Sequence, residues 1–581
     1  MRNRNEQNGL EATVITGSYG ALISIRVTNE QSVNKPDFLG FAIKRDDLTE
    51  QESYPLRGFK YFVDSDRLQT KGQLFDTDKQ PVQSFFWEDF SVKPQHDYVY
   101  HLIPVYGIPK NLQYGPEVTV SISSENVQGS VHSVHFNMGV AGSLAYARRF
   151  DDKRPDQMNE DEKRNVRKWL SRGLEEALLG FIQKAIQNKF GLRIAFYEFT
   201  YSPVLLKLKE AIEAGCHVEI VYDSRQEEEE NDQAIDAADL PRTAKTSTGV
   251  TYNVLHRRTK DPQVPSHNKF MILMNKEVPV EIWFGSTNIT DKGILGHSNV
   301  GHHIVDKALA KKYFDYWECL ATDPSEADIQ VAVDKIQGDI ANIPDFKDNY
   351  TPFFSPRAAK TVLETYGKFI AGANQMVCGI FPFSFSKVMK ASLSTPNKAL
   401  KYLMVDKYKN AAGIIKDKNT LIVNGAYFSK PMFDWLEEIN SGILLNKHPN
   451  PYIGTNYVHN KVLLIDPLTD NAVIIVGSAN FSDPSVTSND ENTVVIKGGY
   501  EMRRICDIYF TEFYRIFHHF FVRVATQEIN KDLDLTAGNV NNPLHLKTDN
   551  SWVAQFRQDH FKIIMQEQMR LMPLDYGQRP S

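Results

Sequence analysis

Two stretches are most informative about this 581-residue chain: HNKVLLID (459–466) and NAVIIVGSANFSDPSVTSNDEN (471–492). An earlier stretch of the same chain matches them position by position. Adding 192 to each position of the first copy gives the second, without a gap. The matched pairs are His267 with His459, Lys269 with Lys461, Gly285 with Gly477, Ser286 with Ser478, Asn288 with Asn480, and Asn299 with Glu491. The repeat predicts that two halves of the chain form one site.

The scaffold around these motifs is repeated as well. LRIAFYEFT (192–200), SPVLLKLKEAIEAG (202–215) and HVEIVYD (217–223) have strand, helix and strand patterns, and residues 378–406 follow the same order. Such β-α-β units are typical of α/β domains. We therefore predict two pseudo-twofold-related α/β domains, each a mixed sheet flanked by helices, at residues 138–325 and 349–545.

The N-terminal part, residues 1–137, has short alternating apolar and polar runs broken by turn residues, which predicts an all-β sandwich. Its segment 85–107 resembles the fibronectin type III family, in which Trp87 would enter the core and Tyr98 would form a tyrosine corner. A different sandwich with a buried Trp and Tyr is the alternative. No catalytic group stands out here, so we interpret the domain as a binding or scaffolding module with a possible protein partner.

Other segments link or extend these domains. A capping box at Asn159 and Glu162 predicts a helix over 159–188. The acidic run 226–239 is interpreted as a solvated, mobile loop, with a lid over the site as the alternative. Three further segments are interpreted as a linker (326–348), a core helix with a wide aromatic face (501–524) and a C-terminal helical tail (546–581).

Composition limits the class of protein. Hydrophobic residues make up 41% and charged residues 24%, which is ordinary for a soluble globular protein. The net charge of −6 gives no global basic field for nucleic acid, although a local basic cleft remains possible. No apolar run is long enough for a secretory signal or a membrane span, so we expect a cytoplasmic protein. The four cysteines are interpreted as buried thiols in a reducing compartment, since they are far apart: Cys216, Cys319, Cys378 and Cys506.

The spacing of the repeated residues indicates chemistry. Residues two apart on a strand share a face, so the His and Lys of each HNK point the same way. The next strand ends in a Gly-Ser-x-Asn turn, whose hydroxyl, backbone N–H and amide can reach an anion. Two such sets facing each other would surround one phosphoryl group. One neutral imidazole would attack phosphorus while the other, protonated, gives its proton to the leaving oxygen.

The motif HxK(x4)D…GSxN formed by His459, Lys461, Asp466 and the turn that follows resembles that of the phospholipase D superfamily. His267 starts the other copy, and the likeness covers about residues 138–525. The resemblance implies a pseudo-twofold α/β fold, a covalent phosphohistidine intermediate, and no required metal or other cofactor.

The first copy departs from that motif, because Met274 stands where Asp466 stands in the second. In this the chain looks like the tyrosyl-DNA phosphodiesterase branch, which also lacks the acid and keeps the His, Lys and Asn. A half-dead first copy is the alternative.

The same branch pairs one histidine with an amide and the other with a glutamate, and Asn299 against Glu491 has this asymmetry. A carboxylate raises the pKa of a neighbouring histidine, and a neutral amide does not. We therefore predict that His459 pairs with Glu491 as general acid and base, while His267 pairs with Asn299 as nucleophile. The family's usual assignment of the nucleophile to the N-terminal copy agrees.

The predicted site is accordingly large. Its catalytic residues are His267, His459, Lys269, Lys461, Asn288, Asn480, Glu491 and Asn299; its substrate-binding residues are Ser286, Ser478, Gly285 and Gly477; Asp466 has a supporting role, and no metal ligand is predicted.

The motif predicts the reaction better than the substrate. HRRTK (256–260) before the first motif, and Lys447 with His448 before the second, favour the phosphate contacts of a nuclease. We therefore favour an intracellular nuclease or nucleic-acid phosphodiesterase, with a phospholipase D acting on phospholipid headgroups second. A third interpretation is a catalytically impaired binding or scaffold protein, which would have no reason to keep both His/Lys pairs. The sequence leaves the oligomeric state open.

Overall fold

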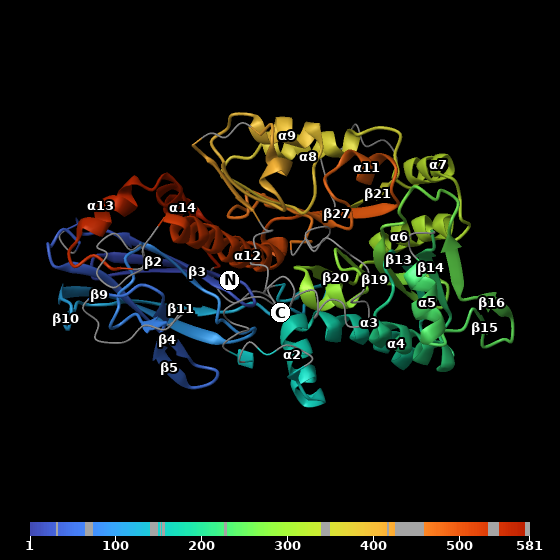
Figure 1. Cartoon of the computed structure of the whole chain (residues 1–581), viewed down its shortest axis with the longest axis horizontal. Helices are drawn as coiled ribbons and strands as arrows, with labels where there is room; N and C mark the ends of the chain where they lie inside the picture. The colour runs from blue at the N-terminus through green and yellow to red at the C-terminus, as the bar shows by residue number, and fades with distance from the viewer. Residues whose placement is uncertain are drawn as a thin grey trace.

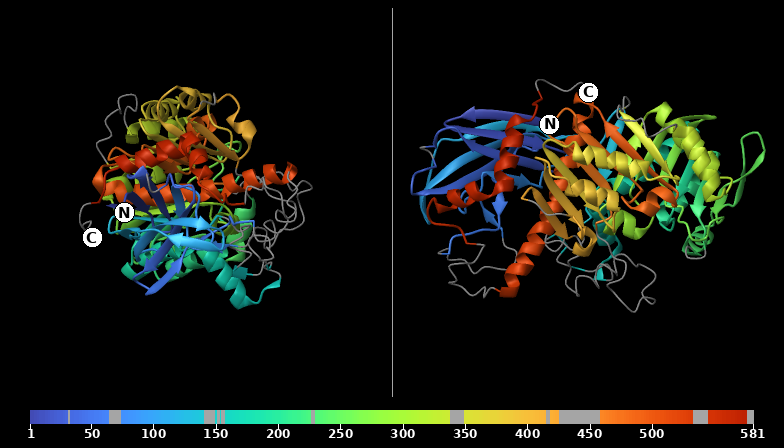
Figure 2. Two further views of the ribbon diagram at one scale, coloured as in Figure 1. Left: turned by 90° about the vertical axis from the view of Figure 1, so that its left-hand side faces the viewer. Right: turned by 90° about the horizontal axis from the view of Figure 1, so that it is seen from above.

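An N-terminal all-β domain lies beside two stacked α/β halves, and one long helix, α12 (Tyr500–Asp532), runs between them (Figure 1). The right-hand view of Figure 2 shows the same separation of the all-β domain from the α/β halves. This computed structural model describes residues 1–30, 33–63, 74–139, 149–150, 153, 157–225, 229–337, 349–414, 418–424, 458–532 and 545–575.

Each α/β half contains a seven-stranded sheet, and the two sheets share one strand order. The first runs β12-β20-β19-β18-β13-β14-β17 and the second β21-β27-β26-β25-β22-β23-β24. β13 pairs parallel with β14 and antiparallel with β18, and β22 pairs in the same ways with β23 and β25. The predicted duplication of a mixed-sheet α/β domain is confirmed.

The strands of the first sheet are β12 (His132–Phe136), β13 (Gly191–Phe196), β14 (Val218–Asp223), β17 (Leu255–Arg258), β18 (Lys269–Asn275), β19 (Val278–Gly285) and β20 (Val300–Ile304). Those of the second are β21 (Tyr350–Ser355), β22 (Met376–Phe381), β23 (Leu400–Val405), β24 (Thr420–Asn424), β25 (Val462–Ile465), β26 (Val473–Gly477) and β27 (Glu491–Lys497).

Helices join and cover these strands. α4 (Ser202–Glu213) connects β13 to β14, and α9 (Lys387–Ser394) connects β22 to β23, as the β-α-β patterns predict. Every residue of β13 and β22 is buried, because helices leave neither face of a central parallel pair open to water. The other covering helices are α3 (Leu174–Asn188), α6 (Lys307–Leu320), α8 (Thr361–Ala371) and α11 (Asp483–Thr487).

The all-β domain has two main sheets, ordered β1-β2-β3-β8 and β10-β9-β4-β5, with β11 also pairing β9, and a small two-stranded sheet of β6 (Arg57–Gly58) and β7 (Phe75–Asp76). An all-β N-terminal domain is therefore confirmed, while its likeness to fibronectin type III stays a prediction. Its strands are β1 (Arg2–Gln7), β2 (Leu10–Thr16), β3 (Ala21–Val27), β4 (Phe38–Asp47), β5 (Glu52–Pro55), β8 (Phe86–Asp89), β9 (Asp97–Ile108), β10 (Asn111–Tyr114) and β11 (Val118–Ser123).

Two aromatic residues singled out in this domain behave differently. Tyr98 is buried, and its hydroxyl accepts a hydrogen bond from the backbone N–H of Lys93 at 2.9 Å. Trp87 is only partly buried and packs against the sandwich core, so its predicted place is confirmed in part. Trp552 is buried in that core, from α13 (Ser551–Gln558), and its indole N–H donates to the backbone carbonyl of Phe38. The C-terminal helices α13 and α14 (His560–Leu571) thus dock on the all-β domain.

Three predicted boundaries change. β12 falls within residues 1–137 but pairs with β20, so it belongs to the first α/β sheet. α7 (Glu326–Gln337) occupies the start of the predicted linker, whose residues 338–348 lie outside the described part. α5 (Glu229–Ala237) occupies most of the acidic run and buries Asn231, so the mobile-loop interpretation is wrong there; residues 226–228 are not described.

The predicted helix over 159–188 is two helices. The capping box at Asn159 and Glu162 is present and begins α2 (Glu160–Ser171). The chain then breaks at Arg172 and Gly173, with φ of 47° and 89°, before α3 begins. Left-handed φ values suit glycine and end the first helix.

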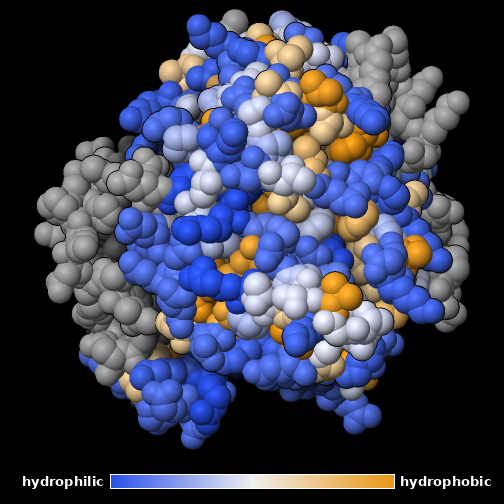
Figure 3. Space-filling view, turned by 90° about the vertical axis from the view of Figure 1, so that its right-hand side faces the viewer, coloured by the Kyte–Doolittle hydropathy of each residue, from blue (hydrophilic) through white to orange (hydrophobic). Residues whose placement is uncertain are grey.

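The face shown in Figure 3 and three of the four cysteines agree with the sequence-based expectations, while Cys319 is less buried than expected. The face shown in Figure 3 is mostly hydrophilic, with hydrophobic side chains in small scattered groups. Among the helices of the described residues, none is long and apolar enough to cross a membrane. All four cysteines are free thiols, three of them buried and Cys319 half-buried.

Candidate active site

The two histidine motifs meet at the boundary between the α/β halves. Ser266 forms a backbone bridge with Asp490, and Ser298 forms the matching bridge with Val458. The same 192-residue offset relates the two bridges. Ser266 and Val458 each stand one residue before a motif histidine, so the halves contact each other beside both histidines.

The middle residue of each HNK also reaches across this boundary. The Asn492 side-chain amide donates to Oδ1 of Asn268 at 2.9 Å. The Ser286 hydroxyl lies 3.1 Å from Oδ1 of Asn460. These side chains alternate with the histidine and lysine along the strand, so they point away from the site and hold the halves together.

His267 is anchored by an acid of the other half. Its Nδ1 lies 2.8 Å from Oε2 of Glu491, which is fully buried. Burial alone would raise the pKa of Glu491, but the His267 ring and Lys269 hold this pKa below its usual value. An ionised carboxylate can only accept, so His267 donates its Nδ1–H and leaves the Nε2 lone pair available.

His459 is anchored by an amide of the other half. Its Nδ1 lies 2.9 Å from Oδ1 of Asn299. The Asn299 amide N–H donates to the carbonyl of Gly293, and the Ser286 hydroxyl donates to Oδ1, so the orientation of the amide is set. His459 therefore also donates Nδ1–H, and its Nε2 is the reactive nitrogen.

The predicted pairing of the histidines is thus wrong. Glu491 contacts His267 and Asn299 contacts His459, each across the pseudo-twofold axis. The physical reason is the pair of backbone bridges. They place the start of β27, with Glu491, beside the first HNK, and the residue before β20, Asn299, beside the second.

Both imidazoles are neutral near pH 7 in the free protein. Burial lowers the pKa of His267 to about 4, although the Glu491 carboxylate opposes this shift. Burial, with the nearby Lys461 and His297, holds the pKa of His459 well below its usual 6.5. Within the described residues, no carboxylate forms an ion pair with His459.

Two lysines complete the cationic part of the site. The ammonium groups of Lys269 and Lys461 donate to the carbonyls of His267 and His459 at 2.7 and 2.8 Å. Burial and the charge of Lys269 hold the pKa of Lys461 well below its usual value. Two buried cations that disfavour each other's charge are stabilised by an anion between them.

The motif serines support the histidine partners. Ser478 donates to Glu491 at 2.7 Å and Ser286 to Asn299 at 2.9 Å. Both serines are fully buried. They orient the groups behind the histidines, and their expected contact with substrate stays a prediction.

The motif glycines permit close strand packing. A Cβ at Gly285 would lie 2.1 Å from the Val300 carbonyl oxygen, and one at Gly477 would lie 2.2 Å from that of Asn492. Any side chain would therefore push apart the strands that carry the histidine partners. The predicted substrate contact of these glycines stays a prediction.

The turn asparagines have partly different surroundings. The Asn288 amide donates to Glu198 at 2.6 Å, while its Oδ1 and that of Asn480 have no partner in the described residues. Burial raises the pKa of Glu198, which lies near Lys269. Glu198 was missed by the sequence reasoning, and its only signal is its place after a buried strand.

Asp466 is structural and remote from the chemistry. Its carboxylate accepts hydrogen bonds from the backbone N–H groups of 374–376, the longest at 3.2 Å. β25 separates it from His459, so the two lie at opposite ends of a strand. Met274 pairs with Gly191 at the matching end of β18. The missing acid therefore removes nothing from the site, which weighs against a half-dead first copy.

The cations expected to contact phosphates have different surroundings. Arg258 is buried and bonded to Asp490 and Asp323, so it does not offer the predicted contact. Arg257 pairs with Asp232 but is more than half exposed, and Lys260 is exposed, so their phosphate contacts stay predictions. Lys447 and His448 lie outside the described residues.

Three aromatic side chains near the motifs were also missed. The Tyr197 ring lies 4.8 Å from the His267 ring, and the Lys269 ammonium lies 5.1 Å from its centre. The Lys461 ammonium lies 5.8 Å from the Phe383 ring, which is 43% exposed. The His297 ring lies 5.2 Å from the His459 ring. Their positions were the available signal. Tyr197 and Phe383 follow the equivalent strands β13 and β22, and His297 stands two residues before Asn299.

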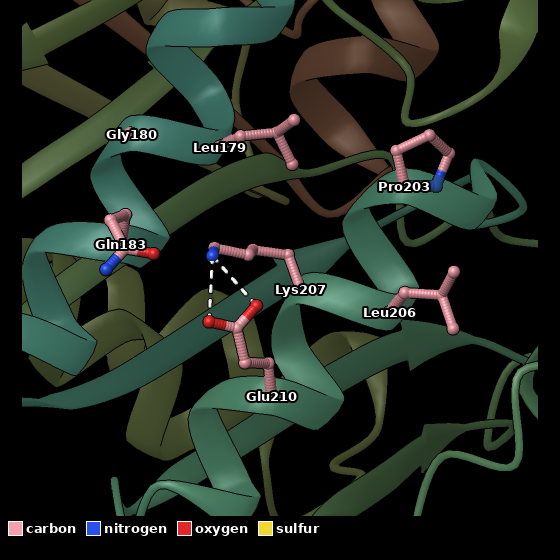
Figure 4. A pocket seen from close by; sticks show the side chains of 7 residues that line it. All are labelled: Leu179, Gly180, Gln183, Pro203, Leu206, Lys207 and Glu210. Carbon is pink, nitrogen blue, oxygen red and sulfur yellow. Dashed lines mark hydrogen bonds and ion pairs between the residues drawn. The ribbon is translucent and has the colours of Figure 1, made fainter.

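In the described ranges, no group of three His, Cys, Asp or Glu side chains is arranged to hold a metal ion. Figure 4 shows a hollow between α3 and α4, where Lys207 pairs with Glu210. None of its seven lining residues belongs to the histidine motifs.

Comparison with protein families gives one match. The family model described as cardiolipin synthase, PLD-like domain, matches residues 181–320 and 404–516, which hold the first and second motif respectively. The chain contains a duplicated phospholipase D-like domain. None of the curated proteins matches the chain.

Solved structures resemble the phospholipase D-like domain at low identity. Polyphosphate kinase from Porphyromonas gingivalis is 8% identical, with a TM-score of 0.35, over 65% of this chain and 49% of that one. Phosphatidylserine synthase from Haemophilus influenzae is 13% identical, with a TM-score of 0.36, over 61% and 91%. Yeast tyrosyl-DNA phosphodiesterase is 11% identical, with a TM-score of 0.27, over 53% and 83%.

Proposed function

We propose that the chain is a metal-independent phosphodiesterase that works through a phosphohistidine intermediate on His267. The observation that carries this proposal is the pair of anchored imidazoles. Each has its Nδ1 bound to a residue of the other half, with Nε2 left as the reactive nitrogen. Two buried lysines beside them supply positive charge for a phosphoryl group.

In the first step, Nε2 of His267 attacks phosphorus and the bond to the leaving oxygen breaks. The ring becomes cationic as the N–P bond forms, and the buried Glu491 carboxylate stabilises that charge. His459 gives its Nε2 proton to the leaving oxygen. His267 therefore remains the proposed nucleophile. The reason differs from the one given by the sequence, because its partner, Glu491, stabilises the phosphohistidine.

In the second step, a water molecule attacks phosphorus and the N–P bond breaks. His459, neutral after the first step, accepts the proton of this water. Lys269 and Lys461 hold the nonbridging oxygens throughout.

The pKa of His459 sets an expected pH dependence. The free enzyme must hold a proton on His459, yet burial and Lys461 keep this pKa well below 6.5. We therefore expect kcat/KM to fall as pH rises above 6.5, at roughly tenfold per unit. A steady-state profile across this range measures it, and a kcat/KM that stays constant or rises with pH would contradict the role of His459.

We propose nucleic acid as the substrate. Tyr197 and Phe383 place aromatic rings beside the two lysines, and Phe383 is open to solvent. Aromatic rings next to phosphate-binding cations suit unpaired bases, each stack contributing about 1–3 kcal/mol. Phospholipid headgroups are the second candidate, because the matching family model carries the name of a lipid synthase.

A substrate panel tests both parts of the proposal. Single-stranded DNA, duplex DNA, RNA and phosphatidylcholine vesicles are incubated with the protein in EDTA, beside the double variant His267→Ala/His459→Ala. We expect cleavage of single-stranded nucleic acid in EDTA by the unaltered protein alone. Cleavage of the vesicles alone would make the chain a phospholipase, and a strict requirement for a divalent ion would exclude metal-independent chemistry.

Phe383→Ala tests the contribution of the exposed ring. Loss of one stacked base, about 1–3 kcal/mol, predicts a rise in KM for single-stranded DNA of roughly 5- to 150-fold. Phe59→Ala is the matched control, because Phe59 is 45% exposed in the all-β domain. An equal effect of both substitutions would remove Phe383 from the substrate path.

A further inference from the structure

A third histidine lies beside the general acid without a partner of its own. His297 is 8% exposed, and neither of its ring nitrogens has a hydrogen-bond partner within the described residues. An unsatisfied buried donor or acceptor costs about 1–3 kcal/mol. A ring with two such atoms, next to a reactive histidine, therefore indicates a ligand that satisfies them.

Local structure fixes where this ring lies. His297 follows η4 (Lys292–Gly296), a single π-helical turn, and its backbone N–H donates to the Lys292 carbonyl at 2.8 Å. Asn137 donates to the carbonyl of His297 at 2.6 Å. Such π-helical turns are rare and are frequent at functional sites.

The ring belongs to the general-acid side of the pocket. It lies 5.2 Å from the His459 ring, with 32° between the ring planes. Burial and the charges of Lys292 and Lys461 lower the pKa of His297 to about 3, so the ring is neutral. A neutral imidazole has one donor nitrogen and one acceptor nitrogen.

We propose that His297 positions the water that cleaves the phosphohistidine, an inference that rests on the proposed function. In an in-line reaction, this water enters opposite His267, where the leaving oxygen stood beside His459. One of its protons passes to Nε2 of His459. The other needs an acceptor, and the acceptor nitrogen of His297 supplies it.

The step balances without another reactant. The water oxygen bonds to phosphorus, and the N–P bond breaks with its electron pair returning to Nε2 of His267. One water proton moves to His459, and the second stays on the product oxygen, bonded to His297. The donor nitrogen of His297 is free to bind a phosphoryl oxygen.

Bis(p-nitrophenyl) phosphate separates the two steps. Its leaving nitrophenolate needs little help from a general acid, so its release reports formation of the phosphohistidine. For His297→Ala, we expect a burst of about one nitrophenolate per enzyme, followed by steady turnover at least about tenfold slower than in the unaltered protein. His297→Asn, which places an amide where the second copy has Asn489, should recover part of the second step.

His303→Ala is the matched control, since His303 is half-buried and bonded to Glu281 away from the motifs. It should show no burst, and thermal unfolding of all variants reports any structural loss. Equal slowing of both steps by His297→Ala would overturn the proposal and make His297 structural. If the unaltered protein does not cleave the diester or any member of the substrate panel, the proposed function fails instead.

Discussion

Replacing His267 or His459 with alanine is expected to lower kcat/KM by about 10^4-fold or more, as for other nucleophile and general-base residues that act as a unit. The two losses should not add in the double variant, because either change stops the same two-step reaction. The measurement is steady-state cleavage of the preferred member of the substrate panel.

The control separates chemistry from folding. His303→Ala removes a histidine that pairs with Glu281 outside the site, so it should keep its turnover. Thermal unfolding should show that the three single variants fold. Substantial turnover by either His267→Ala or His459→Ala would contradict the shared site.

Glu491→Gln is the second large change. The amide keeps the shape and the bond to Ser478 but loses the negative charge 2.8 Å from His267. The cationic phosphohistidine then lacks its counterion, although the amide oxygen held by Ser478 can still accept from Nδ1. We expect kcat to fall by up to about 10^4-fold, the loss seen when the carboxylate behind a catalytic histidine becomes an amide.

Glu281→Gln provides the matched control. Glu281 is a buried acid of the first half, and its Oε2 lies 2.6 Å from Nε2 of His303 in that half. It should cost stability without a comparable loss of kcat. If Glu491→Gln reduces kcat no more than Glu281→Gln does, the carboxylate has no part in stabilising the intermediate.

The repeat made the fold predictable. An offset of 192 aligned two β-α-β units and two motifs, and this alignment is the reason the two sheets have one strand order. Local sequence patterns were less informative about which strands pair and which side chains fill a core. β12 alternates like a sandwich strand, yet it pairs with β20, and a tryptophan from α13 lies deeper in the sandwich core than Trp87 does. Which edge or core a segment joins depends on contacts distant in sequence.

The site was predictable as a set of residues and unpredictable as a set of contacts. The offset identifies equivalent positions, such as Asn299 and Glu491, but does not say whether each faces its own half or the other. The backbone bridges at Ser266 and Ser298 decide this, and they cross the axis. His297 breaks the repeat, since its counterpart is Asn489, so alignment of the two copies gave no reason to select it.

The most direct test of the central claim is to locate the covalent intermediate. His459→Asn lacks the general base for the second step, and a nitrophenolate leaving group needs little help from the general acid in the first. A nitrophenyl diester labelled at the phosphoryl group should therefore leave its label on the protein. We predict acid-labile, alkali-stable label on His267, identified by peptide mapping. Label on any other residue, or cleavage without a labelled protein in this slowed variant, would contradict the assignment of His267 as the nucleophile.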